Sequence, residues 1–254
     1  MLDLERDRIV DAISSGQLNS NNISIDKIRE MARPSKDLWE DLDRGRAILP
    51  TPAHLDQYLH SYAPMIKSQW SIVLSEIEVS TGRLTIFDYG CGQGLAIMLL
   101  LERYGSNLSG RVNKLVLIEP SYVALRRAEK ILGCYLPDCN VRPVNKCLDE
   151  VSPDDLEADD DDVKLHLFSN VIDVEGFDQY SLLREIFSNK GLHCVLAVGN
   201  DRNTHGGSER LEMLFNLLHD DGHRDWLTIH DSKIQRFETD GGKKAIYFHV
   251  MVEV

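Results

Sequence analysis

Residues 84–94 read LTIFDYGCGQG, and this stretch decides the fold. Its first four residues favour β-structure, an acid follows, and glycine then occupies every second position. An amphipathic run, residues 95–104, begins directly afterwards. This order predicts a strand, a tight turn and a helix, which is the unit that opens an open α/β sheet.

The three glycines, Gly90, Gly92 and Gly94, suit a loop that holds a ligand. Glycine lets the backbone turn sharply and lets a ligand approach without a Cβ atom in the way. The first N–H groups of the following helix have no partner inside that helix, so they face the same ligand. We therefore predict a binding site at this loop rather than a turn without function.

The spacing of the glycines separates two kinds of cofactor. A dinucleotide fingerprint reads G-x-G-x-x-G, whereas here the order is G-x-G-x-G with Asp88 two positions before the first glycine. The stretch from Asp88 to Gly94 resembles motif I of the class I S-adenosylmethionine (SAM) dependent methyltransferases. The resemblance implies that the loop, including Cys91, holds the methionine part of SAM and that Asp88 helps to seat it. SAM carries an ammonium and a sulfonium but no phosphate, so a neighbouring carboxylate suits it better than it suits a pyrophosphate.

A second acid, Glu119, follows the next predicted strand, residues 114–118. A carboxylate at that place accepts hydrogen bonds from both hydroxyls of a ribose. The resemblance assigns Glu119 this role toward SAM, although NAD enzymes use the same device. Glu119 could instead cap the helix that begins near Ser121. We predict that it binds the cofactor.

A third strand is predicted for residues 140–144 and is followed by Asn145. By resemblance, the loop at this strand end lies near the adenine ring of SAM, and Asn145 is its cofactor-binding candidate. The acid that many relatives carry at this point is missing here.

The fourth predicted strand, residues 163–168, emerges at Ser169, Asn170 and Asp173. Ligands of open α/β sheets bind outside the carboxyl ends of the strands. These three residues are therefore candidates for the catalytic, acceptor-binding side of the site, and Ser169 is also a cofactor candidate. Residues 169–172 read SNVI and lack the prolines typical of methyltransferases that act on the amino groups of bases, which disfavours that reaction.

His205 is the fourth catalytic candidate and lies in a polar, glycine-rich loop, residues 203–207. This loop follows the predicted fifth strand, residues 191–198, and so belongs to the same edge of the sheet. Histidine titrates near neutral pH and can act as a base. An ordinary loop residue is an equal alternative.

The end of the chain predicts an antiparallel hairpin. Two β-runs, residues 226–237 and 243–254, flank the hairpin signal Asp-Gly-Gly at residues 240–242. Class I methyltransferases finish in this way, whereas dehydrogenases generally do not. We therefore predict an α/β fold for residues 81–254: a seven-stranded, mostly parallel, doubly wound sheet with a C-terminal antiparallel hairpin.

Residues 1–80 are predicted to form an N-terminal helical extension. Helical patterns cover residues 4–13, 25–31 and 36–44, and a longer one covers residues 54–77, where Pro64 should kink or divide the helix. Three aromatic residues of the long helix either line a cofactor or substrate pocket or pack on the sheet: Tyr58, Tyr62 and Trp70. By resemblance, such an extension covers the cofactor and shapes the acceptor site.

Composition limits the classes of protein that remain. The chain has 254 residues, of which 43% are hydrophobic and 27% charged, as in an ordinary globular protein. No apolar run approaches the roughly 20 residues that span a bilayer, and no apolar signal core opens the chain, so we expect a cytoplasmic protein without membrane partners. The net charge is −13, from 28 basic and 41 acidic residues, which disfavours nucleic acid as a partner without excluding a local basic groove.

No metal site is predicted. The five cysteines lack a C-x-x-C pair, and Cys134, Cys139 and Cys147 are loosely spaced, so reduced thiols are expected. The acidic run of residues 149–162 lacks the ligand pattern and the glycine of an EF-hand. Like charges repel one another and stay solvated, so we expect a flexible connection there.

These patterns together favour a SAM-dependent methyltransferase. Methyl transfer is an in-line displacement that depends chiefly on positioning, and a base is needed only where the nucleophile must lose a proton. The methyl acceptor stays open between a small molecule, a protein and an RNA, with the acidic balance favouring the first two. A SAM-binding fold that serves as a binding or assembly factor without catalysis is the main alternative, and a NAD-dependent oxidoreductase is a weaker one.

Overall fold

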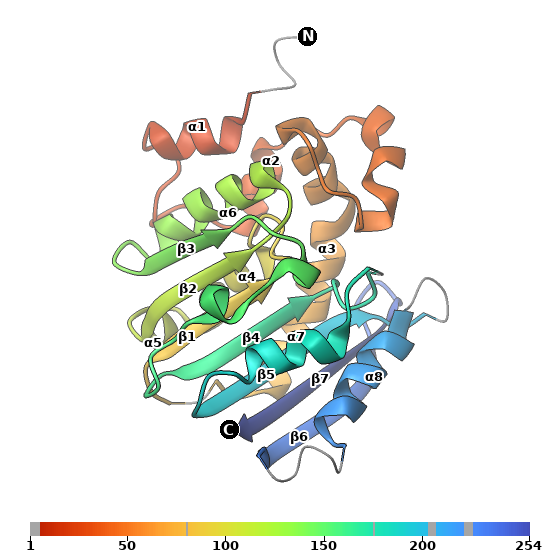
Figure 1. Cartoon of the computed structure of the whole chain (residues 1–254). Helices are drawn as coiled ribbons and strands as arrows, with labels where there is room; N and C mark the ends of the chain where they lie inside the picture. The colour runs from red at the N-terminus through yellow and green to blue at the C-terminus, as the bar shows by residue number, and fades with distance from the viewer. Residues whose placement is uncertain (1–5, 80, 175, 203–206, 221–225) are drawn as a thin grey trace.

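A computed structural model describes residues 6–79, 81–174, 176–202, 207–220 and 226–254 of the chain. Seven strands form one sheet in the order β3-β2-β1-β4-β5-β7-β6, with helices on both faces (Figure 1). The strands are β1 (Leu84–Tyr89), β2 (Val112–Ile118), β3 (Asn140–Val144), β4 (Val163–Ser169), β5 (Leu192–Asn200), β6 (Thr228–Glu238) and β7 (Lys244–Glu253). Strand β7 pairs antiparallel with both β5 and β6, and the other neighbours pair parallel. The predicted α/β fold with its C-terminal hairpin is confirmed.

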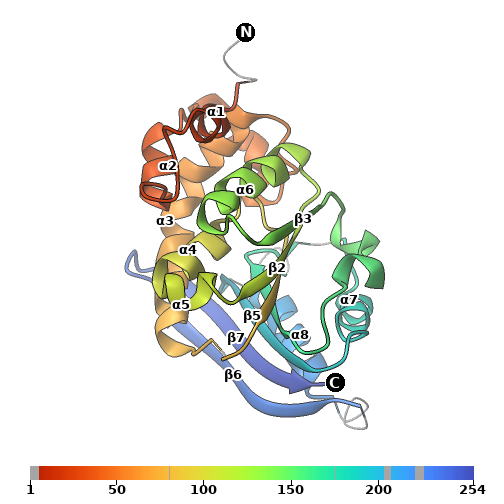
Figure 2. The ribbon, with the colours of Figure 1, turned by 90° about the vertical axis from the view of Figure 1, so that its left-hand side faces the viewer.

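Helices cover the sheet in two layers. Figure 2 shows α1 to α6 on one face and α7 and α8 on the other. The helices are α1 (Arg8–Ser14), α2 (Ile25–Met31), α3 (Pro52–Glu76), α4 (Leu95–Tyr104), α5 (Ser106–Ser109), α6 (Tyr122–Tyr135), α7 (Gln179–Ile186) and α8 (Gly207–Leu218). Each face has its own apolar core, and the core under α4 also contains residues of α1, α2 and α3.

Capping residues start the helices where the sequence indicates. The Ser24 hydroxyl accepts a hydrogen bond from the N–H of Lys27 at the start of α2, and the Ser121 hydroxyl accepts one from Ala124 at the start of α6. Pro64 lies inside α3, and the helix continues through it from Pro52 to Glu76. Of the two predicted effects of Pro64, a kink or a division, the division is therefore wrong. Buried side chains on both sides of Pro64 hold α3 against the sheet, and this packing outweighs the one hydrogen bond that proline removes.

The third predicted helix, residues 36–44, is wrong in a way that shapes the site. Two short 3₁₀ helices, η1 (Lys36–Leu38) and η2 (Glu40–Gly45), replace it, and Asp43 and Arg44 have left-handed φ angles of 40° and 58°. The predicted apolar face does not exist as one surface, because Leu42 is buried whereas Trp39 is 56% exposed. Without a continuous face to bury, an α-helix there gains little from tertiary packing.

The acidic connection, predicted to be solvated and flexible, is partly structured. It contains the short helices η3 (Leu148–Glu150) and η4 (Pro153–Leu156). The Asp155 carboxylate accepts a hydrogen bond from Lys146 Nζ at 2.6 Å, and buried Asp162 pairs with Arg83 and accepts a hydrogen bond from the Thr85 hydroxyl. The expectation of a flexible loop is therefore wrong at these two acids, since each has a fixed cationic partner.

Within the described parts of the chain, no helix is long and apolar enough to cross a membrane. Among the same residues, His, Cys, Asp and Glu nowhere gather in a group of three or more that could hold a metal ion. The five cysteines carry free thiols.

Candidate functional site

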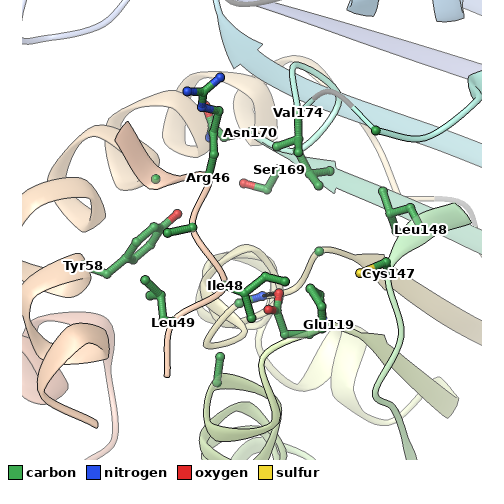
Figure 3. Close-up of a pocket in the computed structure, with 18 of the residues that line it drawn as sticks. Arg46, Ile48, Leu49, Tyr58, Glu119, Cys147, Leu148, Ser169, Asn170 and Val174 are labelled. Atoms are coloured by element: carbon green, nitrogen blue, oxygen red, sulfur yellow. Dashed lines mark hydrogen bonds between the residues drawn. The ribbon is translucent and has the colours of Figure 1, made fainter. Parts of the chain in front are cut away.

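A cavity of about 420 Å³ lies outside the carboxyl ends of the central strands (Figure 3). Such a volume is within the range of roughly 300–1,000 Å³ found for small-molecule sites. Three groups of residues line it: the glycine loop and the strand ends (Gly90, Gly92, Gln93, Glu119, Pro120, Ala124, Ser169, Asn170), the N-terminal segment (Gly45, Arg46, Ala47, Ile48, Leu49, Leu55, Tyr58), and two loops (Cys147, Leu148, Asp149, Val171, Val174, Gly176, Phe177).

The glycine loop has the conformation that its sequence predicts. Gly90, Gly92 and Gly94 have φ angles of 64°, 52° and 80°, a region that other residues rarely adopt. A Cβ atom on Gly90 would lie 2.5 Å from Val171 Cγ2, and one on Gly94 would lie 3.0 Å from Leu132 Cδ1. A Cβ atom on Gly92 would meet nothing within 4 Å. Gly90 and Gly94 are therefore required for packing, whereas Gly92 leaves open space beside the cavity.

Glu119 connects the end of β2 to the glycine loop. Its Oε2 accepts a hydrogen bond from the N–H of Gly92 at 3.0 Å, and its Oε1 accepts one from the N–H of Ser121 at 2.9 Å. Burial raises the pKa of this carboxyl group, and the two N–H groups act in the opposite direction. The contact with Ser121 resembles the helix cap predicted as the alternative role of Glu119. Glu119 also lines the cavity, so its oxygens are available to a ligand there.

Asp88 is the least satisfied group of the site. It is 1% exposed, and neither carboxylate oxygen has a hydrogen-bond partner among the described residues. Burial, and next the charge of Glu119, raise the pKa of Asp88 well above its ordinary value. A buried carboxyl group without a partner is unfavourable, and a nearby cation would relieve that cost.

Asp88 does not line the cavity, and three further predicted cofactor residues support the site without lining it. The N–H of Cys91 donates to the Ile118 carbonyl, and Gly94 begins α4. The Asn145 side chain donates to the carbonyls of Glu119 and Pro120 at 2.9 and 2.8 Å. Asn145 therefore fixes the loop that carries Glu119.

Residues beyond β3 that no sequence motif indicates also line the cavity. Cys147, Leu148 and Asp149 contribute to this wall, four or fewer positions after Asn145. Asp149 thus places a carboxyl group on this wall. Its position at the start of the acidic run is the signal that the sequence offers, but a run of like charges predicts a solvated connection.

Ser169 and Asn170 lie together at the end of β4, and both line the cavity. Two consecutive residues of α3 hold them: Trp70 Nε1 donates to the Ser169 hydroxyl at 2.9 Å, and Asn170 Nδ2 donates to Gln69 Oε1 at 2.9 Å. Asn170 has a left-handed φ of 54°, and its buried Oδ1 has no hydrogen-bond partner in the described chain. Strain and an unsatisfied polar atom meet at this one residue, a combination that is typical of functional sites.

Of the other two catalytic candidates, the structure places only Asp173. Asp173 pairs with Arg202 at 2.5 Å and does not line the cavity. His205 lies outside the described residues.

The N-terminal segment forms the wall opposite the glycine loop. The Ser121 hydroxyl donates to the Leu49 carbonyl at 2.6 Å, which attaches this wall to the loop after Glu119. Of the three aromatic candidates in α3, only Tyr58 lines the cavity. The ring of Tyr62 packs against the ring of Tyr58, and Trp70 is fully buried. Burial, followed by the charge of Glu119, raises the pKa of the Tyr58 hydroxyl, so this hydroxyl stays protonated.

Comparisons with known proteins support the fold. A scan against protein-family models gave no match, and a search of curated proteins found no matching sequence. Among solved structures, the plantazolicin methyltransferase BpumL in complex with SAH is similar with a TM-score of 0.52 and 14% identity, over 83% of this chain and 96% of that one. BpumL with a monoazolic desmethylPZN analog and SAH gives a TM-score of 0.50 and 13% identity, over 95% and 98% of the two chains. The chain therefore has the fold of the SAM-dependent methyltransferases.

Proposed function

We propose that this chain is a SAM-dependent methyltransferase. The observation that carries the proposal is the chemistry of the glycine loop and of the two strand ends beside it. The orphaned Asp88 carboxyl, the Glu119 carboxylate and the open space beside Gly92 together suit a cationic ligand with a ribose. The similarity of the fold to methyltransferase structures with bound SAH agrees with this chemistry.

Each part of the cofactor has a partner in this proposal. The glycine loop would hold the methionine part, with Asp88 nearby to neutralise its positive charge. Glu119 would accept hydrogen bonds from the ribose hydroxyls, in addition to those it accepts from Gly92 and Ser121. Leu148 and Asp149 would meet the adenine ring, Asp149 as the acceptor of a hydrogen bond from its amino group. SAM supplies a methyl group activated by its sulfonium.

The acceptor side would be formed by Tyr58, Ser169 and Asn170. Their side chains lie around the same space in Figure 3 and come from α3 and from the end of β4. Holding the nucleophile in line with the methyl group is the main catalytic contribution available to such residues. We propose residues 1–80 as the cover of this site and the cytoplasm as its location. A small molecule or a protein fits the net charge of −13 better than RNA does.

Calorimetry with SAM, SAH and NAD tests the proposal. We expect SAM and SAH to bind and NAD not to bind. Glu119→Gln should weaken SAH binding by about 10-fold or more, because it removes charged hydrogen bonds. Glu212→Gln is the matched control. Glu212 lies on α8, accepts a hydrogen bond from Arg236 of β6 and does not line the cavity. Absence of SAM and SAH binding by the folded protein would refute the proposal, and binding of NAD alone would favour an oxidoreductase.

A binding or assembly factor with this fold is a second candidate. One observation favours it: Asp173, the acid nearest to the acceptor side in sequence, is held by Arg202 instead of facing the cavity. A methyl-transfer assay with labelled SAM and cell extract fractions distinguishes the two functions. Label in a product supports the enzyme, whereas tight SAM binding without transfer to any fraction supports the factor.

A further inference from the structure

Arg127 is a buried cation that joins the glycine loop to the N-terminal segment. It lies in α6 and is 1% exposed. Its Nε donates to Asp7 Oδ2 at 2.8 Å, and its Nη1 donates to Asp56 Oδ1 at 2.9 Å and to Gln93 Oε1 at 2.8 Å. One guanidinium thus contacts three segments that are far apart in the sequence.

Both acids that face Arg127 also organise the N-terminal segment. Asp7 caps α1 through its other oxygen, which accepts hydrogen bonds from the N–H groups of Ile9 and Val10. Asp56 lies in the first turns of α3, and its other oxygen accepts a hydrogen bond from the N–H of Arg33 at 2.8 Å. The position of the guanidinium therefore depends on where α1 and α3 sit.

Gln93 transmits that position to the glycine loop. This side chain is 2% exposed, accepts from Arg127 and donates from its Nε2 to the Leu55 carbonyl at 3.0 Å. It stands between Gly92, whose N–H is held by Glu119, and Gly94, which begins α4. A shift of Gln93 would displace the Gly92 backbone, which lines the cavity.

We infer that Arg127 is a positioning residue that couples the N-terminal segment to cofactor binding through Gln93. This inference rests on the proposed function, because the ligand it concerns is SAM or SAH. Coupling between two sites is reciprocal. A correctly placed N-terminal segment raises cofactor affinity, and bound cofactor stabilises α1 by the same factor.

Two variants interrupt the coupling at opposite ends while keeping the buried cation. Asp7→Asn removes the charged contact with Arg127 but keeps a good helix cap, since asparagine caps as well as aspartate. Gln93→Met removes both hydrogen bonds of that side chain with little change in volume. Arg83→Met is the control, because it removes a comparable contact with Asp162 at the opposite ends of the strands. Arg127→Met itself leaves Asp7 and the buried Asp56 without their cation and serves only to test folding.

The experiment measures SAH affinity by calorimetry and hydrogen exchange of the α1 amides with and without SAH. In the unaltered protein, SAH should slow exchange in α1. We expect Asp7→Asn to weaken SAH binding about 3- to 10-fold, although residue 7 contributes nothing to the cavity. Gln93→Met should weaken binding and abolish the response of α1 to SAH, whereas Arg83→Met should change neither.

The outcomes separate this inference from the proposed function. If the unaltered protein does not bind SAH, both fail. If it binds SAH while Asp7→Asn binds equally well and α1 exchange ignores the ligand, the coupling is refuted and the cofactor assignment stands. A loss of affinity in Arg83→Met equal to that in Asp7→Asn would also refute the coupling, because general destabilisation would then explain both.

Discussion

The two walls of the cavity are built from different kinds of sequence. The loop wall, formed by Gly90, Gly92, Gln93 and Glu119, comes from a contiguous motif and one strand end. The N-terminal wall, residues 45–58, contains no comparable motif, includes the end of η2 and the start of α3, and has left-handed residues just before it. The first wall could be located from its spacing, whereas the second could not.

The difference lies in how each wall is held. The loop wall takes its conformation from glycines at alternate positions, which is a local property. The N-terminal wall is attached by hydrogen bonds between residues that are 72, 38 and 75 positions apart: Ser121 to Leu49, Gln93 to Leu55, and Arg127 to Pro52. Long-range contacts of this kind carry no periodic signal in the sequence. A wall of the cavity can therefore be held by several hydrogen bonds and still leave no recognisable pattern in the sequence.

The largest expected effect tests the loop wall with two matched substitutions. Gly90→Ala should lower the free energy of unfolding by about 2–5 kcal/mol, because left-handed strain adds to the overlap with Val171. Gly92→Ala meets open space, so it should lower the free energy of unfolding by only about 1–2 kcal/mol of strain. Gly92→Ala should nevertheless weaken SAH binding, since its methyl group enters the space beside the cavity. Urea unfolding and calorimetry measure both quantities, and equal destabilisation by the two substitutions would contradict the assignment.

Asp88→Asn tests whether the buried carboxyl group before the glycine loop destabilises the protein when no ligand is bound. Burial raises the pKa of Asp88 in the native protein. As the pH increases, the unfolded chain therefore loses this proton first, near pH 3.8. The stability of the native protein then falls with increasing pH until the raised pKa is passed. Without ligand, Asp88→Asn should therefore be more stable than the unaltered protein at pH 7. This advantage should disappear below pH 3.8, while SAH binding at pH 7 should be weaker. Thermal unfolding between pH 4 and 7 measures the trend, and a stability difference that does not change with pH would contradict it.

Much of the fold followed from the sequence because strands and turns carry local signals. The helix of residues 95–104 and the strand of residues 140–144 have the predicted bounds, and the glycine loop lies at the predicted strand end. The prediction of a helix for residues 36–44 is wrong because Trp39 and Leu42, although apolar, do not share a buried face. Helical spacing indicates a helix only where tertiary packing uses it.

The site was predictable only in part, and the reason again lies in long-range contacts. Glu119, Ser169 and Asn170 line the cavity as strand ends should. The sequence could not show that Arg202 holds Asp173, that Asn145 braces the Glu119 loop, or that Asp149 lines the cavity. Each of these facts depends on a partner or a turn whose position only the folded chain defines.

The smallest expected effect concerns Asn170, where the N-terminal wall meets the end of β4. Asn170→Gly and Asn170→Ala both remove the hydrogen bond to Gln69, but only alanine keeps the strain of the left-handed φ of 54°. The glycine variant should therefore be more stable than the alanine variant by about 1 kcal/mol. If Asn170 orients the methyl acceptor, both variants should lose methyl transfer equally while binding SAH normally. Urea unfolding, calorimetry and the labelled-methyl assay measure the three quantities. Retained transfer in either variant would remove Asn170 from the acceptor side, whereas weaker SAH binding in both would move it to the cofactor side of the cavity.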